Sequence, residues 1–293
     1  LTGTIRDLLL DAGFADVGTC PAVPPPGAER LDRWLAEGLH GGMDYMAVRP
    51  EERKDPSRYH GTARWVVVAV ARYPAAPLEL VDGKTGRVLR IAAYAARKDY
   101  HQVLRRRLHR VRLALRARLG LRGRVFVDSA PILEKAVAVH AGLGRIGRNG
   151  CLIHPTHGSW LLIGGFTVDR ELVRLHPPGP GGTCGECRLC QVACPVGALH
   201  GEGILDARRC LSYWTVEHAG PIPREVQAKT AATGTLFGCD ACQRACPDNR
   251  GRGTGEPEIL ELGPDPQLAA LTVEDLERID AGEFDAIFGE TPI

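Results

Sequence analysis

The stretch that decides the fold begins with Cys184-Gly-Glu-Cys187-Arg-Leu-Cys190-Gln-Val-Ala-Cys194-Pro195 and ends with Cys239-Asp-Ala-Cys242-Gln-Arg-Ala-Cys246-Pro247. Cys210 lies between these two runs. The first run has the spacing with which bacterial ferredoxins ligate [4Fe–4S] clusters. The second run repeats the later part of this spacing, and Cys210 provides the thiol that it lacks. Eight thiolates are the number that two such clusters require.

The ligands of each cluster follow from a crossing rule. In two-cluster ferredoxins the last cysteine of each run binds the cluster of the other run. The first cluster is therefore expected on Cys184, Cys187, Cys190 and Cys246, and the second on Cys194, Cys210, Cys239 and Cys242. Zinc sites and disulfides are the alternatives. All-cysteine zinc sites use paired C-x2-C knuckles without the third cysteine or the Cys-Pro step. Disulfides are unusual in a chain without a visible secretory signal.

Composition indicates a globular protein. The chain has 293 residues, of which 25% are charged, and it is long enough for one large core and a smaller second domain. No apolar run reaches the length of a membrane span, and the expected location is the cytoplasm. The formal net charge is only +2, but the stretch from Arg97 to Arg124 contains eleven Lys or Arg and a single acid, Asp99. This asymmetry indicates an anionic partner.

Hydrophobic patterning predicts a mixed α+β fold. Helices are expected at 4–12, 28–39, 100–119 and from Pro131 to about Ala141, and strands at 14–19, 65–70, 123–127 and 160–168. The β-branched run Trp65–Val70 is typical of a strand buried on both faces. A loop is expected after Pro74, with a turn at Gly83–Gly86. The acidic segment Pro257–Asp285 is predicted to be helical.

A Pro/Gly-rich linker at His176–Gly182 divides the prediction into parts. We expect an N-terminal α/β domain at 1–175 and a two-cluster ferredoxin-like domain at 176–255. Residues 256–293 are expected to form a C-terminal helical segment that is incomplete.

The helix predicted at 100–119 carries the basic charge. One stripe is apolar and consists of Leu104, Leu108, Val111, Leu115 and Leu119. Arginines cover much of the remaining surface: Arg105, Arg106, Arg107, Arg110, Arg112, Arg116 and Arg118. A solvated helix face is one interpretation, and contact with the phosphates of a nucleic acid is the other. Acidic residues are almost absent from this helix, so its arginines have few i,i+4 ion-pair partners. A phosphate-rich partner would explain this composition.

Asp128 follows the strand predicted at 123–127 and begins the segment Asp128-Ser-Ala-Pro-Ile-Leu-Glu134. Asp128 or Ser129 is a candidate N-cap of the next helix, with Pro131 in its first turn. Gly142-Leu-Gly-Arg-Ile-Gly147 matches G-x-G-x-x-G, but it follows a helix and therefore lacks the context of a dinucleotide site. A glycine-rich helix end that lets the backbone approach a bulky ligand fits better.

Together these segments resemble the epoxyqueuosine reductase family of cobalamin-dependent iron–sulfur enzymes. The matching stretches are Lys98–Leu104, Val127–Glu134, Ala141–Gly144, Arg148-Asn149, His157–Ser159, the first cysteine run, Arg209–Tyr213, Ile222-Pro223 and Phe237–Gln243. The resemblance implies a cobalamin-binding domain and a domain with two [4Fe–4S] clusters. It implies two-electron reduction of epoxyqueuosine to queuosine at the wobble position of tRNA. A monomer supplied by an external low-potential electron donor is expected.

The resemblance also implies roles for individual residues. Asp128 matches the proposed proton donor above the cobalt, although an N-cap is its alternative role. Cobalamin contacts are implied for Arg53, Tyr94, Asp128, Arg148, Asn149, Ser212 and Asp240. The cysteine set of the second cluster is expected nearer the cobalt. His101, His154 and His157 are expected to be structural or surface residues, and Cys20 and Cys151 buried thiols.

This chain departs from the family pattern at one notable position. Asp248 follows Cys246-Pro247, where the family usually has Trp or another apolar residue. Two other functions remain open. One is a corrinoid iron–sulfur reductase acting on a small molecule, against which the arginine-rich helix argues. The other is a two-cluster electron carrier, which would leave the sequence before Cys184 without a purpose.

Overall fold

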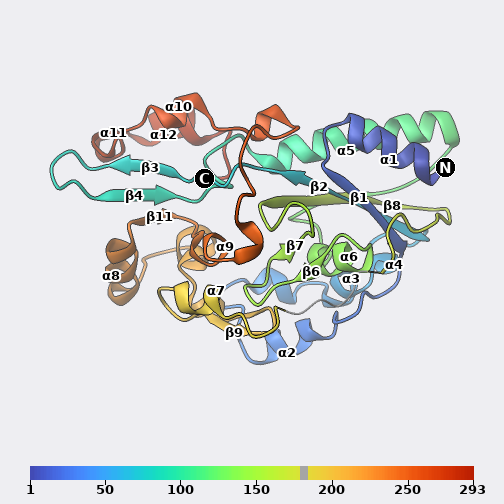
Figure 1. Cartoon of the computed structure of the whole chain (residues 1–293), viewed down its shortest axis with the longest axis horizontal. Coiled ribbons are helices and arrows are strands. Elements are labelled where there is room, and N and C mark those ends of the chain that lie inside the picture. Colours follow the sequence, from blue (N-terminus) through green and yellow to red (C-terminus); the bar gives the residue numbers. More distant parts are fainter. Residues whose placement is uncertain (179–183) are drawn as a thin grey trace.

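A four-stranded sheet forms the centre of the computed structural model, which describes residues 1–178 and 184–293 (Figure 1). Its strands are β1 (Asp16–Pro21), β2 (Trp65–Arg72), β8 (Leu161–Val168) and β5 (Val125–Val127), in the order β1-β2-β8-β5. Every pairing is antiparallel. The mixed α+β fold is therefore confirmed, but the α/β description of the N-terminal part is wrong. A continuous apolar strand requires cover on both faces, not parallel neighbours.

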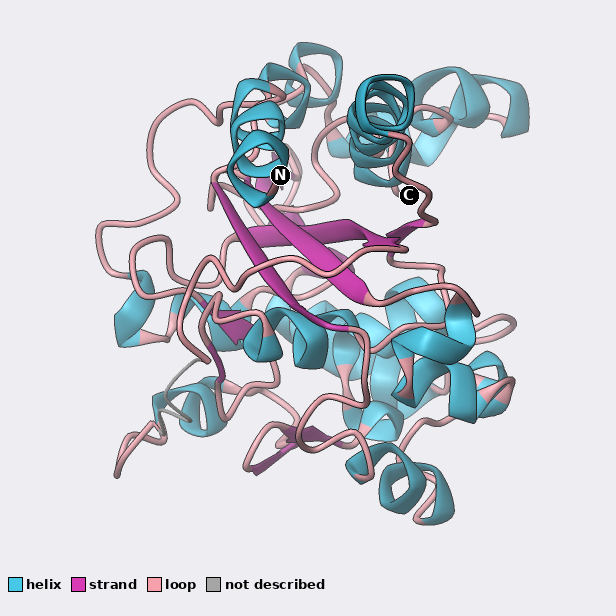
Figure 2. Cartoon of the chain, turned by 90° about the vertical axis from the view of Figure 1, so that its right-hand side faces the viewer, coloured by secondary structure: helices cyan, strands magenta, loops and turns pink. Residues whose placement is uncertain are grey.

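Helices supply that cover on both sides of β2 (Figure 2). Val67 faces the core shared with α1 (Thr2–Asp11) and α5 (Tyr100–Leu119). Its neighbour Val68 points the opposite way, into the core shared with α6 (Glu134–His140). Successive side chains of a strand alternate between its faces, so a run that is apolar at every position serves two cores. The prediction of a strand buried on both faces is confirmed.

Helix α5 has the bounds that the sequence predicts. Asp99 is its N-cap and accepts a hydrogen bond from the backbone N–H of His101 at 2.9 Å. Gly120 ends the helix in the left-handed conformation with φ 65°. The apolar stripe is buried at Leu104, Leu108, Val111 and Leu115. Leu119 is 38% exposed, so the stripe ends one turn earlier than predicted.

A hairpin replaces the loop predicted after Pro74. It consists of β3 (Leu78–Val81) and β4 (Val88–Ile91), and its turn includes the predicted Gly83–Gly86. A third strand, β11 (Thr235–Phe237), comes from the cysteine-rich half of the chain and pairs with β4 in parallel. This sheet therefore joins the two predicted domains by backbone hydrogen bonds.

The remaining elements are short. In the first half they are α2 (Arg30–Ala36), η1 (Asp44–Ala47), α3 (Pro50–Lys54), α4 (Pro56–Tyr59), β6 (Arg145–Ile146) and β7 (Leu152–Ile153). The cysteine-rich half contains α7 (Leu189–Ala193), β9 (Leu199–Gly201), β10 (Ile204–Leu205), η2 (Ala207–Arg209), η3 (Tyr213–Glu217), α8 (Arg224–Thr233), α9 (Ala241–Arg244) and η4 (Pro247–Asn249). Part of the predicted linker, residues 179–183, lies outside the described residues. No helix in the described ranges is long and apolar enough to cross a membrane.

The C-terminal segment folds back onto the hairpin (Figure 1). The predicted helical stretch is a series of short helices: η5 (Leu260–Leu262), α10 (Pro266–Ala269), α11 (Val273–Arg278) and α12 (Ala281–Phe288). Leu268 and Phe288 pack in one apolar cluster with Leu80 and Ile91 of the hairpin. Thr272 and Asp280 cap the last two helices with capping boxes. These caps divide the segment because each one begins a new helix.

Arg97 connects the hairpin region to the rest of the core. Its side chain is 1% exposed, and its guanidinium donates hydrogen bonds to the carbonyl oxygens of Ala93, Pro74 and Ala76 and, at 2.7 Å, of Leu262. These bonds join segments that are far apart in sequence. A buried cation of this kind is tolerated because each N–H finds an acceptor.

Replacing Arg97 with methionine is expected to destabilise the fold. The substitution keeps the apolar stem but leaves several buried carbonyl oxygens without donors, which costs roughly 3 kcal/mol. A lower midpoint in thermal unfolding followed by circular dichroism would measure this loss. The matched control is Arg116→Met on the exposed face of α5, for which we expect a change within about 0.5 kcal/mol. Equal midpoints for the two variants would contradict the structural role of Arg97.

Candidate functional site

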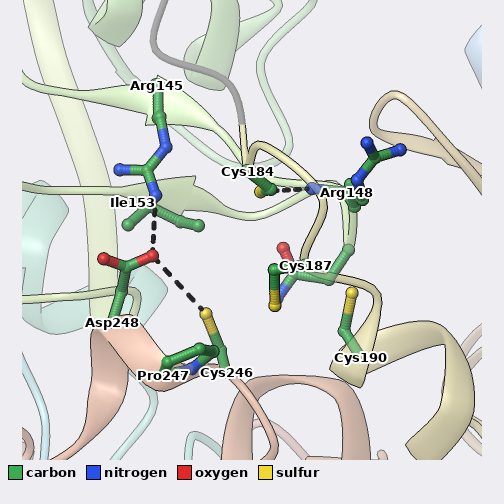
Figure 3. Close-up of a pocket in the computed structure, with 10 residues that line it drawn as sticks. Arg145, Arg148, Ile153, Cys184, Cys187, Cys190, Cys246, Pro247 and Asp248 are labelled. Carbon is green, nitrogen blue, oxygen red and sulfur yellow. Dashed lines mark hydrogen bonds and ion pairs between the residues drawn. The ribbon is translucent and has the colours of Figure 1, made fainter.

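The first cysteine set surrounds a cavity of about 200 Å³ (Figure 3). Cys184 and Cys187 lie in the loop before α7, Cys190 lies on α7, and Cys246 follows α9. The structure therefore brings together the four residues expected for the first cluster, three from one run and one from the other. The other residues that line the cavity are Arg145, Arg148, Asn149, Ile153, Pro247 and Asp248.

Each cysteine run ends in a Cys-Pro step that terminates a short helix. Helix α7 ends at Ala193, and Cys194 is extended with ψ 113°. Cys246 is likewise extended, with ψ 125°, directly after α9. Proline disfavours the helical conformation in the residue before it, which ends each helix at its cysteine. Helices α7 and α9 pack against each other, so both runs present their thiols in one region.

The thiols of the second cysteine set lie close to one another. Burial raises the pKa of the Cys242 thiol, and the neighbouring Cys151, Cys239, Cys210 and Cys194 raise it further. Burial likewise raises the pKa values of Cys210 and Cys239. Thiolates in such a setting require a strong cationic partner. Within the described ranges no three Cys, His, Asp or Glu side chains converge on a point that could hold a single metal ion. The four expected ligands of the first set line one cavity, and those of the second set lie within electrostatic reach of one another.

Asp128 lies at the end of β5 in a left-handed conformation with φ 48°. Its side chain is 56% exposed, and its Oδ2 lies 2.7 Å from Nε2 of His101. The other ring nitrogen of His101 lies 2.7 Å from Oδ1 of Asp99. Tyr100 stacks on the His101 ring with centroids 4.0 Å apart. The N-terminus of α5 thus places one imidazole between two carboxylates.

This arrangement sets the protonation state of the pair. Burial raises the pKa of Asp128, but the hydrogen bond and charge of His101, together with a hydrogen bond from Tyr100, outweigh it and leave that pKa below its usual value. Burial lowers the pKa of His101, but Asp128 and Asp99 raise it above its usual value. The hydrogen bond between the two side chains therefore favours an ionised Asp128 next to a protonated His101.

Glu134 supports Asp128 from the following helix. Its carboxyl oxygen accepts a hydrogen bond from the backbone N–H of Asp128. Burial raises the pKa of Glu134 well above its usual value, and the charge of Asp128 raises it further. Helix α6 begins at Glu134 with Leu133 as its N-cap. The prediction that Asp128 or Ser129 caps this helix, with Pro131 in its first turn, is wrong.

The residues expected to contact cobalamin fall into two groups. Tyr94 lies within electrostatic reach of both Asp128 and Asp240. Asp240 is 8% exposed, adjoins Cys239 and accepts a hydrogen bond from the backbone N–H of Ala93 at 2.7 Å. Ser212 precedes η3, and its backbone N–H donates to the Cys210 thiol. One group therefore links Asp128 to the second cysteine set. It consists of Asp128, Tyr94, Asp240 and Ser212.

Arg53, Arg148 and Asn149 lie elsewhere. Arg53 is 8% exposed, and its guanidinium donates to the carbonyl oxygens of Tyr45 at 2.9 Å and Val48 at 3.3 Å. It holds the loop that brings Tyr45 near Asp128. Arg148 and Asn149 line the cavity of the first cysteine set. The structure thus separates these two residues from the group around Tyr94.

The comparisons with known proteins agree with this geometry. A model of the 4Fe-4S double cluster binding domain matches residues 183–249, and a model described as epoxyqueuosine reductase QueG, DUF1730 matches residues 53–129. An epoxyqueuosine reductase from Pseudomonas aeruginosa is 38% identical over 268 residues, which cover 88% of this chain and 72% of the relative. The chain belongs to the epoxyqueuosine reductase family.

Solved structures of the epoxyqueuosine reductase family have the same fold. The Streptococcus thermophilus epoxyqueuosine reductase superposes with a TM-score of 0.86 at 28% identity, over 98% of this chain and 75% of that one. An epoxyqueuosine reductase with a tRNA-Tyr epoxyqueuosine-modified tRNA stem loop superposes with a TM-score of 0.83 at 27% identity. That match covers 97% of this chain and 75% of that one. The family resemblance predicted from the sequence is confirmed.

Proposed function

We propose that this chain reduces epoxyqueuosine to queuosine in tRNA, with cobalamin and two [4Fe–4S] clusters as cofactors. One observation carries the proposal: Tyr94 lies within electrostatic reach both of Asp128, which is hydrogen-bonded to His101, and of Asp240, which adjoins Cys239 of the second cysteine set. Removing the epoxide oxygen as water requires two electrons and two protons. The first half of the site supplies protons, and the second half delivers electrons.

Asp240, one of the residues expected to contact cobalamin, lines a pocket of about 300 Å³ next to Cys239. The polar lining of this pocket includes Arg90, Arg244 and Thr235, which offer donors and acceptors to the amides of a corrin. We assign Tyr94, Asp128, Ser212 and Asp240 to cobalamin, and Arg53 to the support of the loop that brings Tyr45 near Asp128. When bound, cobalamin supplies a reduced cobalt centre that passes electrons to the epoxide.

The protons come from the side chains around Asp128. Opening an epoxide develops negative charge on its oxygen, which a nearby acid must neutralise. The proton shared between His101 Nε2 and Asp128 Oδ2 meets this requirement, and solvent replaces it through the exposed side of Asp128. Asp99 and Tyr100 hold the imidazole in place. Glu134, whose pKa is raised by burial, accepts a hydrogen bond from the backbone N–H of Asp128 and fixes its position.

The proposal keeps the three predicted segments of the chain but treats them as one functional unit. Residues 1–175 carry the proton-holding pair, residues 176–255 carry the clusters, and residues 256–293 cover the hairpin. The cysteine sets of the two clusters follow the crossing rule, and the second set lies nearer the cobalt. The parallel pairing of β11 with β4 supports a single functional unit in place of two independent domains.

The exposed arginines of α5 are proposed to bind the tRNA backbone. Arg106 and Arg107 are engaged by Glu261, whereas Arg110, Arg116 and Arg118 remain exposed. His101 lies in the first turn of α5, and Arg105 reaches Ser129 next to Asp128, so the basic face extends directly from the site. Phosphate contacts position a nucleic acid and carry little sequence information.

Reversing the charge of Arg110 and Arg116 together is expected to weaken tRNA binding. Each lost phosphate contact should reduce the slope of log affinity against log salt by about 1. Binding titrations at several salt concentrations measure both quantities. The matched control is Arg33→Glu on α2, an exposed arginine on the far side of the sheet (Figure 1). Equal losses for the two faces would contradict the assignment of α5.

An anaerobic assay tests the proposed function as a whole. The reconstituted chain is incubated with cobalamin, a strong reductant and tRNA that carries epoxyqueuosine, and the nucleosides are analysed by mass spectrometry. Conversion to queuosine is the expected result. Absence of conversion by a chain that carries both clusters and cobalamin would reject the proposal. A reductase for small molecules would instead reduce a free epoxide and leave the tRNA unchanged.

A further inference from the structure

Asn149 has a buried polar group that the rest of the site leaves unused. It is 7% exposed and lines the cavity of the first cysteine set. Its Oδ1 accepts a hydrogen bond from the backbone N–H of Cys151 at 3.2 Å, which fixes the orientation of the amide. Its Nδ2 has no hydrogen-bond partner among the described residues. A buried donor without a partner is destabilising, so a ligand in the cavity is expected to accept a hydrogen bond from it.

The neighbouring backbone points to the same ligand. The N–H of Arg148 donates to Sγ of Cys184 at 3.4 Å (Figure 3). Two consecutive residues, which lie between the short strands β6 and β7, therefore direct N–H groups toward sulfur or toward the space that the four thiols enclose. This segment belongs to the N-terminal half of the chain. The first cluster is consequently enclosed by both halves.

We propose that Asn149 Nδ2 and the Arg148 backbone N–H donate hydrogen bonds to the sulfurs of the first cluster and raise its reduction potential. This inference rests on the part of the proposed function that places a [4Fe–4S] cluster on Cys184, Cys187, Cys190 and Cys246. Reduction adds one negative charge to a cluster, and its sulfurs then become better acceptors. Donors aimed at sulfur therefore stabilise the reduced form more than the oxidised form.

The Asp248 carboxylate at the same cavity is expected to lower the reduction potential of the first cluster. Asp248 Oδ2 lies 3.9 Å from Sγ of Cys246 and 2.6 Å from the Arg145 guanidinium (Figure 3). The carboxylate next to the ligand disfavours added negative charge, and Arg145 offsets most of this effect. The amide and the ion pair thus set the potential together. A stabilised reduced state keeps one electron available for a reaction that consumes two.

The test is an anaerobic redox titration of the reconstituted full chain, followed by electron paramagnetic resonance. Asn149→Leu removes the donor at similar volume and is expected to shift the potential of the first cluster to more negative values. Asp248→Asn removes the carboxylate charge and is expected to shift it to more positive values. The matched control is Gln191→Leu. This amide also lies next to a ligand, Cys190, but donates to the Leu199 carbonyl oxygen at 3.1 Å, so we expect no shift.

Iron analysis accompanies every titration and keeps the result independent of activity. An Asn149→Leu chain with the wild-type iron content and an unchanged potential would overturn the inference. If the wild-type chain does not reduce the epoxide, the proposed function is rejected. A measured shift in the potential of the first cluster would still support the role of Asn149.

Wild-type protein provides a second test if the Asn149 variant does not assemble its cluster. Asn149 and Asn249 are the only asparagines of the chain. Asn249 Nδ2 already donates to Ser159 Oγ at 2.9 Å and to the Gln243 carbonyl oxygen at 2.7 Å. Selective ¹⁵N labelling of asparagine therefore nearly isolates Asn149. Pulsed electron paramagnetic resonance of the reduced protein is expected to show a nitrogen coupling that changes with the label. Absence of this coupling would contradict the hydrogen bond.

Discussion

The Cys242→Ala chain is expected to lose the reduction of tRNA-bound epoxyqueuosine completely while keeping the first cluster. Burial raises the pKa of the Cys242 thiol, and Cys239, Cys210 and Cys194 lie within electrostatic reach of it. With one of its four proposed ligands removed, the second cluster is not expected to assemble. Iron content should fall from about eight to about four atoms per chain, because each cluster contains four irons. Iron and sulfide analysis, together with nucleoside analysis of the tRNA, measures both effects.

Cys151→Ala is the matched control for this loss. The Cys151 thiol is within electrostatic reach of Cys242 as well as of Cys190 and Cys246, and burial raises its pKa. It belongs to neither set of proposed ligands. We expect full iron content and turnover close to that of the wild type. Loss of iron in this variant, with retention in Cys242→Ala, would reverse the assignment of the two residues.

Cysteine spacing could be interpreted from the sequence because the geometry it encodes is local. Three thiols of the first cavity lie within seven consecutive residues, 184–190, and a cluster can accept them with little help from the fold. Helix α5 could also be predicted from the sequence. Its twenty-residue amphipathic pattern is bounded by the N-cap Asp99 and by Gly120, which define where the helix begins and ends. In both cases the residues that decide the structure are near one another in the sequence.

The parts that could not be predicted depend on distant partners. Strand β4 has a weak pattern of its own, and it is stabilised by pairing with β11 from residues 235–237. His101 lies in a stretch that resembles the family, but the sequence predicts only a structural or surface role, and only the fold places it between Asp99 and Asp128. The segment 145–149 faces the first cysteine set for the same reason, since β6 and β7 turn it toward residues 184–190. Sequence spacing contains no information on such approaches.

The conformation of Asp128 could not be predicted from its local sequence. Aspartate after a strand and before Pro131 resembles a helix cap, and local propensity favours that interpretation. In the structure the hydrogen bond from its backbone N–H to Glu134 and the contact of its side chain with His101 hold it at positive φ. Residues that depart from local preference in this way concentrate at functional sites. The departure therefore supports the proposed role in proton transfer.

The second large effect is expected for Asp128→Asn. The amide keeps the size of the side chain but cannot share a proton with His101, so turnover should fall about 10²–10⁴-fold. Cobalamin binding, followed by its absorption spectrum, and iron content should remain close to those of the wild type. Ser129→Ala is the matched control. Within the described residues the Ser129 hydroxyl hydrogen-bonds only to Arg105 and to the Val127 carbonyl oxygen, so we expect this variant to retain most activity.

The pH dependence distinguishes a proton-holding pair from a merely structural contact. Asp128 and Asp99 raise the pKa of His101, so the pair keeps its proton to more alkaline pH than a free histidine and loses it as pH rises through that raised value. Asp99→Asn removes one of the two charges but preserves a capping side chain for α5. The alkaline limb of the activity profile should therefore move to lower pH, with little change in turnover at acidic pH. An unmoved limb would show that another group holds the proton, because removing an anion next to His101 must lower its pKa.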